Sequence, residues 1–578
     1  MRRSVHTHYR SIALALLFIA LGMFSTAAPV HASGTVTNCA NDTDFSNKLA
    51  GGGAVDFNCG IATIPFSSTK TIALHTTIDG GGKVTLSGSF SNRLFIVNSG
   101  VTLTLKNITL INGYNSDSNG GGAVFNSGTL ALDNVTIKDM PDSGFNGGAI
   151  STAGSLNIAN STFFNNKALN GGAIYANGAG AIISISSSRF EQNAATGTTQ
   201  NTNGFGGGIY AKNGGQVNIG GTLFYKNTAE QGGALHIAYP DTTLILQMSE
   251  LRENSVRDQG GAILNAGTSS LTDVSINGNT TPGVSSGGGI YNYGNLTLSR
   301  VTLNNNTSYA GGGITNFLGT AYMTNVTLSD NTATAYGGGI DNFKATMTLI
   351  NVTLNGNSHG ILNQNSVDTH LHLTNVIVAN SKTGNNCAFN KAPDTSDHNL
   401  SSDATCNFGA GRDSLKLKLG ALDTNGGATT THRLLPGSPA IDSGVTVTSV
   451  NGVFVNSIFT DQRGITRPQG AAFDVGAFEF VPCAGAPTKP ALLSPIAGVQ
   501  VPTQTVLLDW AGPDCVKTFS VSVRQGSKTG PIVFSKSKIK PTQVTTTALA
   551  TNQKYFWQVT ACNGVGCAMS NWGKFKIQ

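Results

Sequence analysis

Two acidic residues, Glu230 and Asp258, have the types and the spacing that acid/base chemistry requires. Each stands directly before the same tetrapeptide, Gln-Gly-Gly-Ala, so the two occupy one position of a repeated unit. In a stacked-repeat fold, their backbones would lie about 5 Å apart on adjacent units. Paired carboxylates of this kind can cleave glycosides or hold a calcium ion. Lys226, Arg252 and Arg257 could neutralise the pair, and no further acid shares its column, so a structural role is favoured.

A row of aromatic side chains is the second candidate site. The residue after each repeated aliphatic position is expected to point outward from a strand. Four of these residues could stack on sugar rings as a ligand-binding stripe: Tyr175, Tyr210, His236 and Tyr291. Alternatively, β-rich surfaces simply favour tyrosine, or a loop covers the stripe. If the stripe is exposed, it predicts carbohydrate binding.

Motifs of other chemistries are absent from the sequence. It has no serine nucleophile with a plausible His/Asp pair, no phosphate-cradling loop, and no cysteine or histidine spacing typical of zinc. We therefore predict no cofactor and no metal. Catalytic residues are expected only under an enzyme alternative, in which Glu230 and Asp258 would carry the chemistry.

An internal repeat determines the elements that must position these residues. A Gly-Gly-Ala/Gly-aliphatic tetrapeptide recurs at spacings of 26, 24, 35, 26, 28, 27, 24 and 26 residues, and the polar stretch 194–203 accounts for the spacing of 35. Glycine pairs allow a positive φ at a tight corner, so the aliphatic residue can turn inward. The aliphatic residues are Val124, Ile150, Ile174, Ile209, Leu235, Ile263, Ile290, Ile314 and Ile340, followed by a truncated copy at Ile361.

A second signature, an apolar residue three positions before an asparagine, runs in phase with the first. Segments between the two signatures alternate with a period of two, which is typical of strands. Stacked units would place the asparagines in one column, where they could bond to each other and to the backbone, so their predicted role is structural. The predicted column is Asn166, Asn193, Asn227, Asn254, Asn279, Asn306, Asn331, Asn357 and Asn380.

A unit of about 26 residues made of short strands fits one coil of a β-solenoid. We therefore predict an all-β protein whose residues 33–480 form a right-handed parallel β-helix of the pectate-lyase-like type, with about ten coils. Because open solenoid ends expose strand edges, caps are expected. Residues 41–49 read as a short capping helix, and the last coils up to residue 480 are expected to be irregular.

The first 32 residues read as a signal peptide. Three arginines precede an apolar run at residues 12–24, and Val30-His31-Ala32 offers a small-x-small cleavage site. The run is too short to span a bilayer comfortably, so the processed chain is not expected to be an integral membrane protein. The arginines are Arg2, Arg3 and Arg10.

Net charge gives no indication of a polyanionic partner. The whole chain carries +6, and without the three leader arginines the value is near +3. This is too weak to suggest nucleic acid or an anionic membrane. The protein is expected at the cell surface or outside the cell, as a monomer.

Eight cysteines are read as disulfides, because an even count in an exported protein favours pairing over metal binding. Local spacing suggests Cys39–Cys59, Cys387–Cys406 and Cys562–Cys567. Elimination then leaves Cys483–Cys515.

The C-terminal part of the chain changes character after a linker at residues 481–487. Glycine becomes rarer, and all three tryptophans of the chain occur here. Strand-like segments around Trp510, Trp557 and Trp572 resemble a fibronectin type III sandwich, which predicts such a domain at residues 488–578. Trp510, Tyr555 and Trp557 are expected to pack in its core.

Two further resemblances concern the solenoid. Gly171-Gly-Ala-Ile174 with Phe190-Glu-Gln-Asn193 resembles the repeats of the polymorphic outer-membrane-protein family of autotransporter adhesins, over roughly residues 120–380. The resemblance implies the solenoid architecture and suggests adhesion. Residues 422–479 look like the C-terminal region of bacterial surface β-helix proteins. The charged groups of this region are predicted to form internal bridges that close the last coil: Asp461, Arg463, Arg467 and Asp474.

These observations predict a secreted or cell-surface, non-catalytic β-helix protein that serves adhesion or binds a surface or extracellular polysaccharide. The expected partner is a carbohydrate or a cell-surface ligand, and not nucleic acid. The alternatives are a polysaccharide lyase or glycoside hydrolase of the β-helix type, and a structural component of a surface layer.

Overall fold

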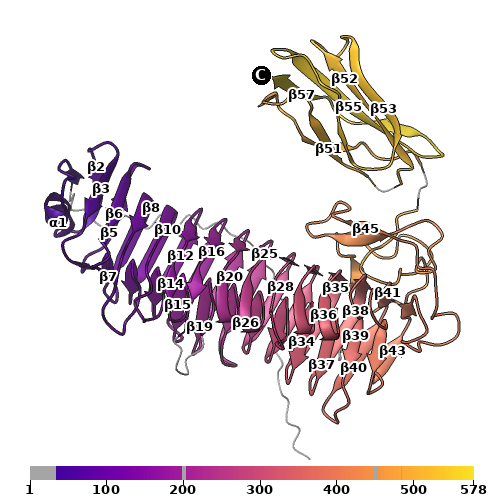
Figure 1. Cartoon of the computed structure of the whole chain (residues 1–578), viewed down its shortest axis with the longest axis horizontal. Helices are drawn as coiled ribbons and strands as arrows, with labels where there is room; N and C mark the ends of the chain where they lie inside the picture. Colours follow the sequence, from indigo (N-terminus) through magenta and orange to yellow (C-terminus); the bar gives the residue numbers. More distant parts are fainter. Residues whose placement is uncertain are drawn as a thin grey trace, which may run out of the picture.

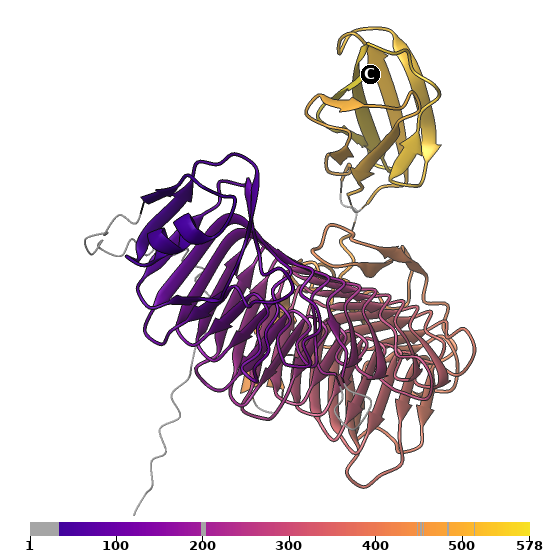
Figure 2. The ribbon, with the colours of Figure 1, turned by 60° about the vertical axis from the view of Figure 1, so that its left-hand side comes forward.

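A computed structural model describes most of the chain after the predicted signal peptide, which lies outside the described residues. The described residues are 34–578 except 198–203, 448, 451–452, 455, 483–484 and 514. Parallel strands stack into a solenoid of about 13 coils, which Figure 1 shows as a rod that begins at α1, and Figure 2 brings this end forward. The prediction of an all-β parallel solenoid is therefore confirmed.

One side of each coil belongs to a 13-stranded parallel sheet, here called sheet II, that contains the aliphatic residues of the repeat. These residues pair in register, for example Ile263 with Ile290 and Ile290 with Ile314, and they are buried. Its strands are β4 (Lys70–Ile72), β7 (Phe95–Val97), β9 (Val124–Asn126), β11 (Ile150–Thr152), β15 (Ile174–Asn177), β19 (Ile209–Lys212), β23 (Leu235–Ile237), β27 (Ile263–Asn265), β30 (Ile290–Asn292), β34 (Ile314–Phe317), β37 (Ile340–Phe343), β39 (Ile361–Asn363) and β42 (Cys387–Phe389).

The opposite side belongs to a 25-stranded parallel sheet, sheet I, to which most coils contribute two consecutive stretches of strand. Between these two stretches the chain bends at a residue with positive φ, such as Asn134, Asn160 or Asp273. The strands are β1 (Gly34–Val36), β2 (Gly53–Phe57), β3 (Ala62–Pro65), β5 (Thr76–Asp79), β6 (Val84–Ser87), β8 (Thr102–Ile111), β10 (Thr129–Lys138), β12 (Ser155–Ala159), β13 (Thr162–Phe164), β16 (Ile182–Ser186), β17 (Arg189–Glu191), β20 (Gln216–Gly220), β21 (Leu223–Tyr225), β24 (Thr243–Gln247), β25 (Glu250–Arg252), β28 (Thr268–Thr272), β29 (Ser275–Asn277), β31 (Asn295–Ser299), β32 (Thr302–Asn304), β35 (Thr320–Ser329), β38 (Thr346–Asn355), β40 (His370–Thr374), β41 (Ile377–Ala379), β43 (Thr395–Asp397) and β44 (Leu400–Ser401).

Short strands form a third side between the asparagine column and the glycine pairs. They are β14 (Lys167–Ala168), β18 (Ala194–Ala195), β22 (Thr228–Gln231), β26 (Ser255–Gln259), β33 (Thr307–Ala310) and β36 (Thr332–Tyr336).

The glycine pairs form the corner that leads into sheet II, and each glycine is needed for a different reason. The first, such as Gly260, has a positive φ of 71°, and residues other than glycine rarely adopt this backbone conformation. The second faces the next coil: a Cβ on Gly261 would lie 2.1 Å from the carbonyl oxygen of Gly288. Coils can therefore stack at normal strand spacing only if this position has no side chain.

The asparagine column forms a continuous buried ladder from Asn166 to Asn357. In each step the Nδ2 group of one asparagine donates to Oδ1 of the next, at 2.8–3.0 Å, and Nδ2 also donates to a carbonyl of the preceding coil. The prediction that Asn380 belongs to this column is wrong. Strand pairing aligns Leu354 with Val378, which puts Ser381 opposite Asn357 and moves Asn380 to an exposed corner.

An aromatic cluster caps the N-terminal end. The predicted helix is present as α1 (Thr43–Leu49), and its Phe45 is fully buried against Phe57 and Phe66, with ring centroids 5.6 Å apart in both cases. The buried Asp42 precedes the helix and forms an ion pair with Lys70 at 2.6 Å.

Three predicted disulfides are confirmed: Cys39–Cys59, Cys387–Cys406 and Cys562–Cys567. The fourth involves Cys483, which lies outside the described residues, so the Cys483–Cys515 pairing stays a prediction. None of the described cysteines is free.

Residues 402–480, here called the strap, were expected to form irregular last coils, but they do not continue the solenoid. Their strands pair antiparallel: β45 (Leu419–Asp423) with β46 (Thr431–Leu434), and β47 (Ser449–Val450) with β48 (Val453–Phe454), before the 3-10 helix η1 (Asn456–Phe459). The strap folds back over the outer face of sheet I, where Thr429 donates to the carbonyl of Arg300 and Thr327 donates to Gln462. Polar outward residues on the last coils provide this docking surface.

The final strands form a separate two-sheet module, drawn in yellow in Figure 1. Trp510, Tyr555 and Trp557 are buried between the sheets, as expected from the sequence. The fibronectin type III identity and the predicted domain boundaries stay predictions. The strands are β49 (Ala491–Ser494), β50 (Val499–Val501), β51 (Leu507–Ala511), β52 (Thr518–Gln525), β53 (Ile532–Ile539), β54 (Gln543–Thr545), β55 (Lys554–Cys562), β56 (Cys567–Met569) and β57 (Gly573–Ile577).

In the described part of the chain, no helix combines the length and the apolar composition that crossing a membrane requires.

Candidate functional site

The aromatic stripe predicted on sheet II is present but covered. Its side chains are only 5–8% exposed: Tyr175, Tyr210, His236 and Tyr291. The corner glycine four residues before each side chain brings the backbone close to it. At Gly232 the approach is so close that a Cβ would lie 2.9 Å from the Cβ of His236. The expectation of an exposed sugar-stacking stripe was therefore wrong.

Phe205 completes this cover over the centre of the stripe. Its ring lies 5.3 Å from Tyr210 and 4.7 Å from His236, measured between centroids. Burial raises the pKa of Tyr210 and of Tyr291 well above the usual range. These rings act as packing that joins the coils.

His236 makes the stability of this packing depend on pH. Burial lowers the pKa of its imidazole to about 3, whereas an unfolded histidine titrates near 6.5. The unfolded chain thus binds one more proton between these values, so stability is complete above pH 6.5 and falls towards pH 3. We expect wild type to lose about 3 kcal/mol more than His236→Phe between pH 7 and pH 4. Urea unfolding of both proteins at the two pH values measures the difference, and equal losses would contradict it.

Each acid of the predicted pair has a polar partner, a cation for Glu230 and a neutral amide for Asp258. Glu230 Oε2 lies 3.7 Å from Arg257 Nη1, and Asp258 Oδ2 accepts a hydrogen bond of 2.6 Å from Gln231 Nε2. Ala229 pairs with Val256 and Gln231 with Gln259, so the register shifts at Glu230, which faces both Arg257 and Asp258 on the next coil. The structure thus gives both carboxylates a local structural partner.

An open, uncharged surface lies on the outer face of sheet I. Six neighbouring strands of the sheet, one from each of six adjacent coils, have three outward-facing residues each. None of these 18 residues is charged. Fourteen carry a hydroxyl or an amide. We call this surface the neutral face: Ser155, Asn157, Ala159, Ile182, Ser184, Ser186, Gln216, Asn218, Gly220, Thr243, Ile245, Gln247, Thr268, Ser270, Thr272, Asn295, Thr297 and Ser299.

A groove of about 380 Å³ follows the bend beside the neutral face. The strap forms its wall through Ala428 and Thr429. Asp273 on its floor is held by Arg300 in a two-pronged ion pair of 2.7 and 2.8 Å. The other lining residues are Gly221, Thr222, Leu223, Met248, Ser249, Glu250 and Ser275.

Polar contacts fix the strap wall in place. Gln462 Nε2 donates to Thr302 Oγ1 and to Thr429 Oγ1, both at 2.9 Å. His432 bonds through Nδ1 with the carbonyl of Gly420 and through Nε2 with Ser329 Oγ. The position of the groove wall therefore depends on contacts between residues more than 100 positions apart.

The four charged residues predicted as internal bridges are buried in the strap. Arg463 pairs with Asp461 at 2.7 Å, and Arg467 pairs with Glu479 at 3.0 Å. The side chain of Asp474 accepts backbone N–H groups instead, and burial raises its pKa to about 7. The bridges close the strap and not a last coil.

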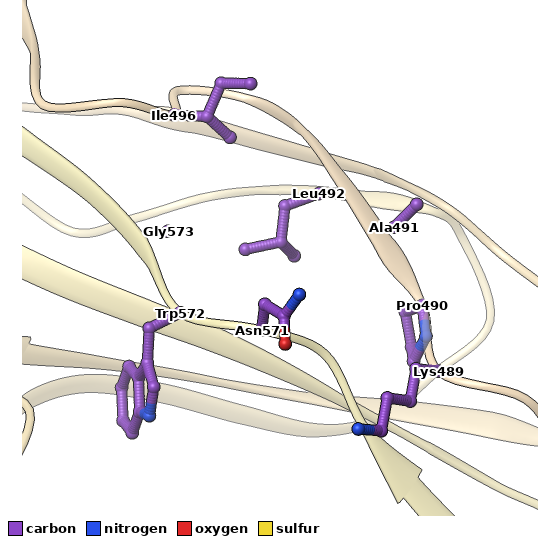
Figure 3. A pocket seen from close by; sticks show the side chains of 8 residues that line it. All are labelled: Lys489, Pro490, Ala491, Leu492, Ile496, Asn571, Trp572 and Gly573. Carbon is purple, nitrogen blue, oxygen red and sulfur yellow. The ribbon is translucent and has the colours of Figure 1, made fainter.

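A second pocket, of about 420 Å³, lies in the C-terminal module (Figure 3). Leu492 and Asn571 project into its middle, Trp572 lies at one end, and Lys489 at the other (Figure 3). Ile496 borders it and is 44% exposed.

Sequence reasoning missed a second asparagine ladder and the groove. Asn265, Asn292, Asn316, Asn342 and Asn363 stand two positions after the repeat aliphatics and bond to each other at 2.8–3.0 Å. This spacing was visible in the sequence. The groove was not, because the strap wall comes from residues far along the chain.

Comparison with protein-family models finds a match to a short stretch of the solenoid. Residues 160–177 match the model of the Chlamydia polymorphic membrane protein repeat, and they contain one copy of each repeat signature. No curated protein and no solved structure shows a significant match to the chain. The protein is thus a parallel β-solenoid that carries a polymorphic membrane protein repeat.

Proposed function

We propose that this protein is an extracellular, non-catalytic rod that binds a neutral polysaccharide along the neutral face. The observation that carries the proposal is the absence of charge from 18 outward positions on six adjacent strands, most of which bear hydroxyl or amide groups. Such groups donate and accept hydrogen bonds as sugar hydroxyls do. Coils repeat at about 4.8 Å, so a polymer with a regular repeat meets equivalent groups along the face.

Export and surface location belong to the same proposal. The apolar leader, the disulfides and the match to a membrane-protein repeat support them. A rigid solenoid suits this role because its binding groups are held in fixed positions before the ligand arrives.

Charge introduced into the neutral face is expected to abolish binding. In Asn218→Glu/Thr297→Glu, two carboxylates would need to be desolvated against the polymer, so affinity for a neutral glucan or mannan should fall at least tenfold. The control Thr228→Glu/Thr332→Glu changes two exposed strand residues on the third side of the coil. Pull-down with insoluble polymers and titration with soluble ones give the affinities. Equal losses in both variants, or no binding of any neutral polymer by wild type, would overturn the proposal.

The lyase or hydrolase alternative is tested in the same screen. Release of new reducing ends or unsaturated products that disappears in Glu230→Gln would support an enzyme at Glu230 and Asp258. We expect no such release, because both acids already have local partners. Self-assembly without any glycan binding would favour the surface-layer alternative.

A further inference from the structure

The charge of this protein is divided between its two parts. Residues 485–578 contain ten lysines and arginines but two acids, which gives a net charge of +8. Residues 33–484 contain 22 basic and 27 acidic residues, a net charge of −5. The moderate charge of the whole chain therefore conceals a strongly cationic C-terminal module.

Five residues concentrate this charge on the outer face of one sheet. Strands β57, β55 and β52 lie side by side (Figure 1). Pairing sets Lys574 opposite Phe556, and Phe556 opposite Arg524, in one row across the three strands. In the next row, Lys576 stands opposite Lys554. We call Arg524, Lys554, Phe556, Lys574 and Lys576 the basic patch.

The basic patch costs stability in the free protein. Directly opposite residues of antiparallel strands have Cβ atoms about 5 Å apart, and like charges there repel. No ion pair of the described residues involves a side chain of the patch. Asp509 stands in β51 of the other sheet, and the module contains no glutamate. An external anion is the partner that would relieve this repulsion.

We infer that the basic patch binds an anionic polysaccharide. Its lysines and Arg524 would pair with carboxylate, sulfate or phosphate groups, and the half-buried ring of Phe556 between them offers an apolar surface to a sugar ring. Repeated anionic groups along one polymer could pair with Lys554 and Lys576, which stand directly opposite each other at about 5 Å, and with the two cations that flank Phe556. A single-stranded nucleic acid is less favoured, because such ligands stack on several aromatic platforms and the patch has one.

This site differs from the neutral face in position and in ligand. The neutral face lies on sheet I of the solenoid, while the basic patch lies on the C-terminal module. Two sites of opposite preference would let one chain connect a neutral polymer to an anionic one.

The test compares two triple variants of the full chain without its leader. Lys554→Gln/Lys574→Gln/Lys576→Gln removes three charges from the patch, and Lys528→Gln/Lys538→Gln/Lys540→Gln removes three exposed charges elsewhere in the same module. Calorimetric titrations use polygalacturonate, dextran sulfate, uncharged dextran and an oligothymidine. The dextran and oligothymidine arms separate anionic glycans from neutral glycans and from nucleic acid.

Wild type is expected to bind at least one anionic polysaccharide with an affinity that falls as salt rises, whereas the affinity for dextran, a candidate ligand of the neutral face, should be the same in wild type and in the patch variant. The patch variant should lose at least tenfold in affinity for the anionic polysaccharide and show a shallower salt dependence, and the control variant less than threefold. Equal losses in the two variants, tighter binding of oligothymidine, or no binding of either anionic polymer would each overturn the inference. Unchanged near-UV circular dichroism of the variants would show that the core around Trp557 stays folded.

Discussion

Replacing Arg467 with methionine is expected to destabilise the strap by about 3–5 kcal/mol. Arg467 and Glu479 are both fully buried and pair at 3.0 Å. The guanidinium also donates to the carbonyls of Asp474 and Gly476. Arg467→Met would leave the carboxylate of Glu479 in the interior without a counter-charge, which costs far more than the loss of an exposed pair.

A double variant separates the buried charge from the packing. Arg467→Met/Glu479→Gln removes both charges, so it should recover more than half of the loss in Arg467→Met. Hydrogen exchange at the Gln462 amide, which donates to the carbonyl of Ala477, reports the stability of the strap. If the double variant is as unstable as Arg467→Met, the contacts to the two carbonyls, and not the ion pair, hold the strap.

The same variant connects the strap to the groove. Gln462 lies next to Asp461 in the chain and bonds to Thr302 and Thr429. When the strap loosens, the wall at Thr429 is released, so ligands that need the groove should bind more weakly in Arg467→Met. Binding on the neutral face away from the strap, around Ser184, should change less.

The sequence was most informative where one residue type has one physical role in every coil. Gly261 cannot carry a side chain because the next coil is too close, and Asn254 is buried with its side-chain hydrogen bonds made to its column neighbours and to a backbone carbonyl. Such positions recur at a visible spacing. The solenoid and its register could therefore be predicted, and local cysteine spacing was enough to predict three disulfides.

Prediction failed where burial depends on parts that do not repeat. The residue after each aliphatic points away from the core, as alternation requires, yet Tyr210 is covered by Phe205, which follows the insertion in its coil. Asn380 has the right spacing from Ile377, but pairing aligns Val378 with the core position. The strap closes over polar outward residues that no local pattern distinguishes from the exposed neutral face.

The distribution of charge was hidden for a related reason. The total of +6 does not reveal it, because the acidic solenoid offsets the basic module. Counting by domain would have found the asymmetry, but the face that gathers Lys554, Lys574 and Lys576 follows only from the strand register.

Replacing Asn254 with alanine is expected to lower the free energy of unfolding by about 4 kcal/mol. Its Nδ2 group donates to the carbonyl of Phe224 and to Asn279 Oδ1, and its Oδ1 accepts from the backbone and the side chain of Asn227. Asn254 is fully buried, so water cannot replace these bonds. Each buried group left without a partner costs about 1–3 kcal/mol.

The loss of stability in Asn254→Ala should be large but confined to a few coils. Each coil contacts only its neighbours, so the effect should be concentrated in the coils that hold Asn227, Asn254 and Asn279. Hydrogen exchange of the Asn227 amide, whose acceptor is removed, should accelerate more than exchange at Asn331, which lies three steps beyond Asn254 in the column. The control Asn218→Ala removes an exposed amide from the outer face of sheet I and should cost less than about 0.5 kcal/mol. If Asn254→Ala costs no more than this control, the column is not what holds the coils together, and the stacked apolar residues such as Phe190 and Phe224, 4.8 Å apart, must carry that role alone.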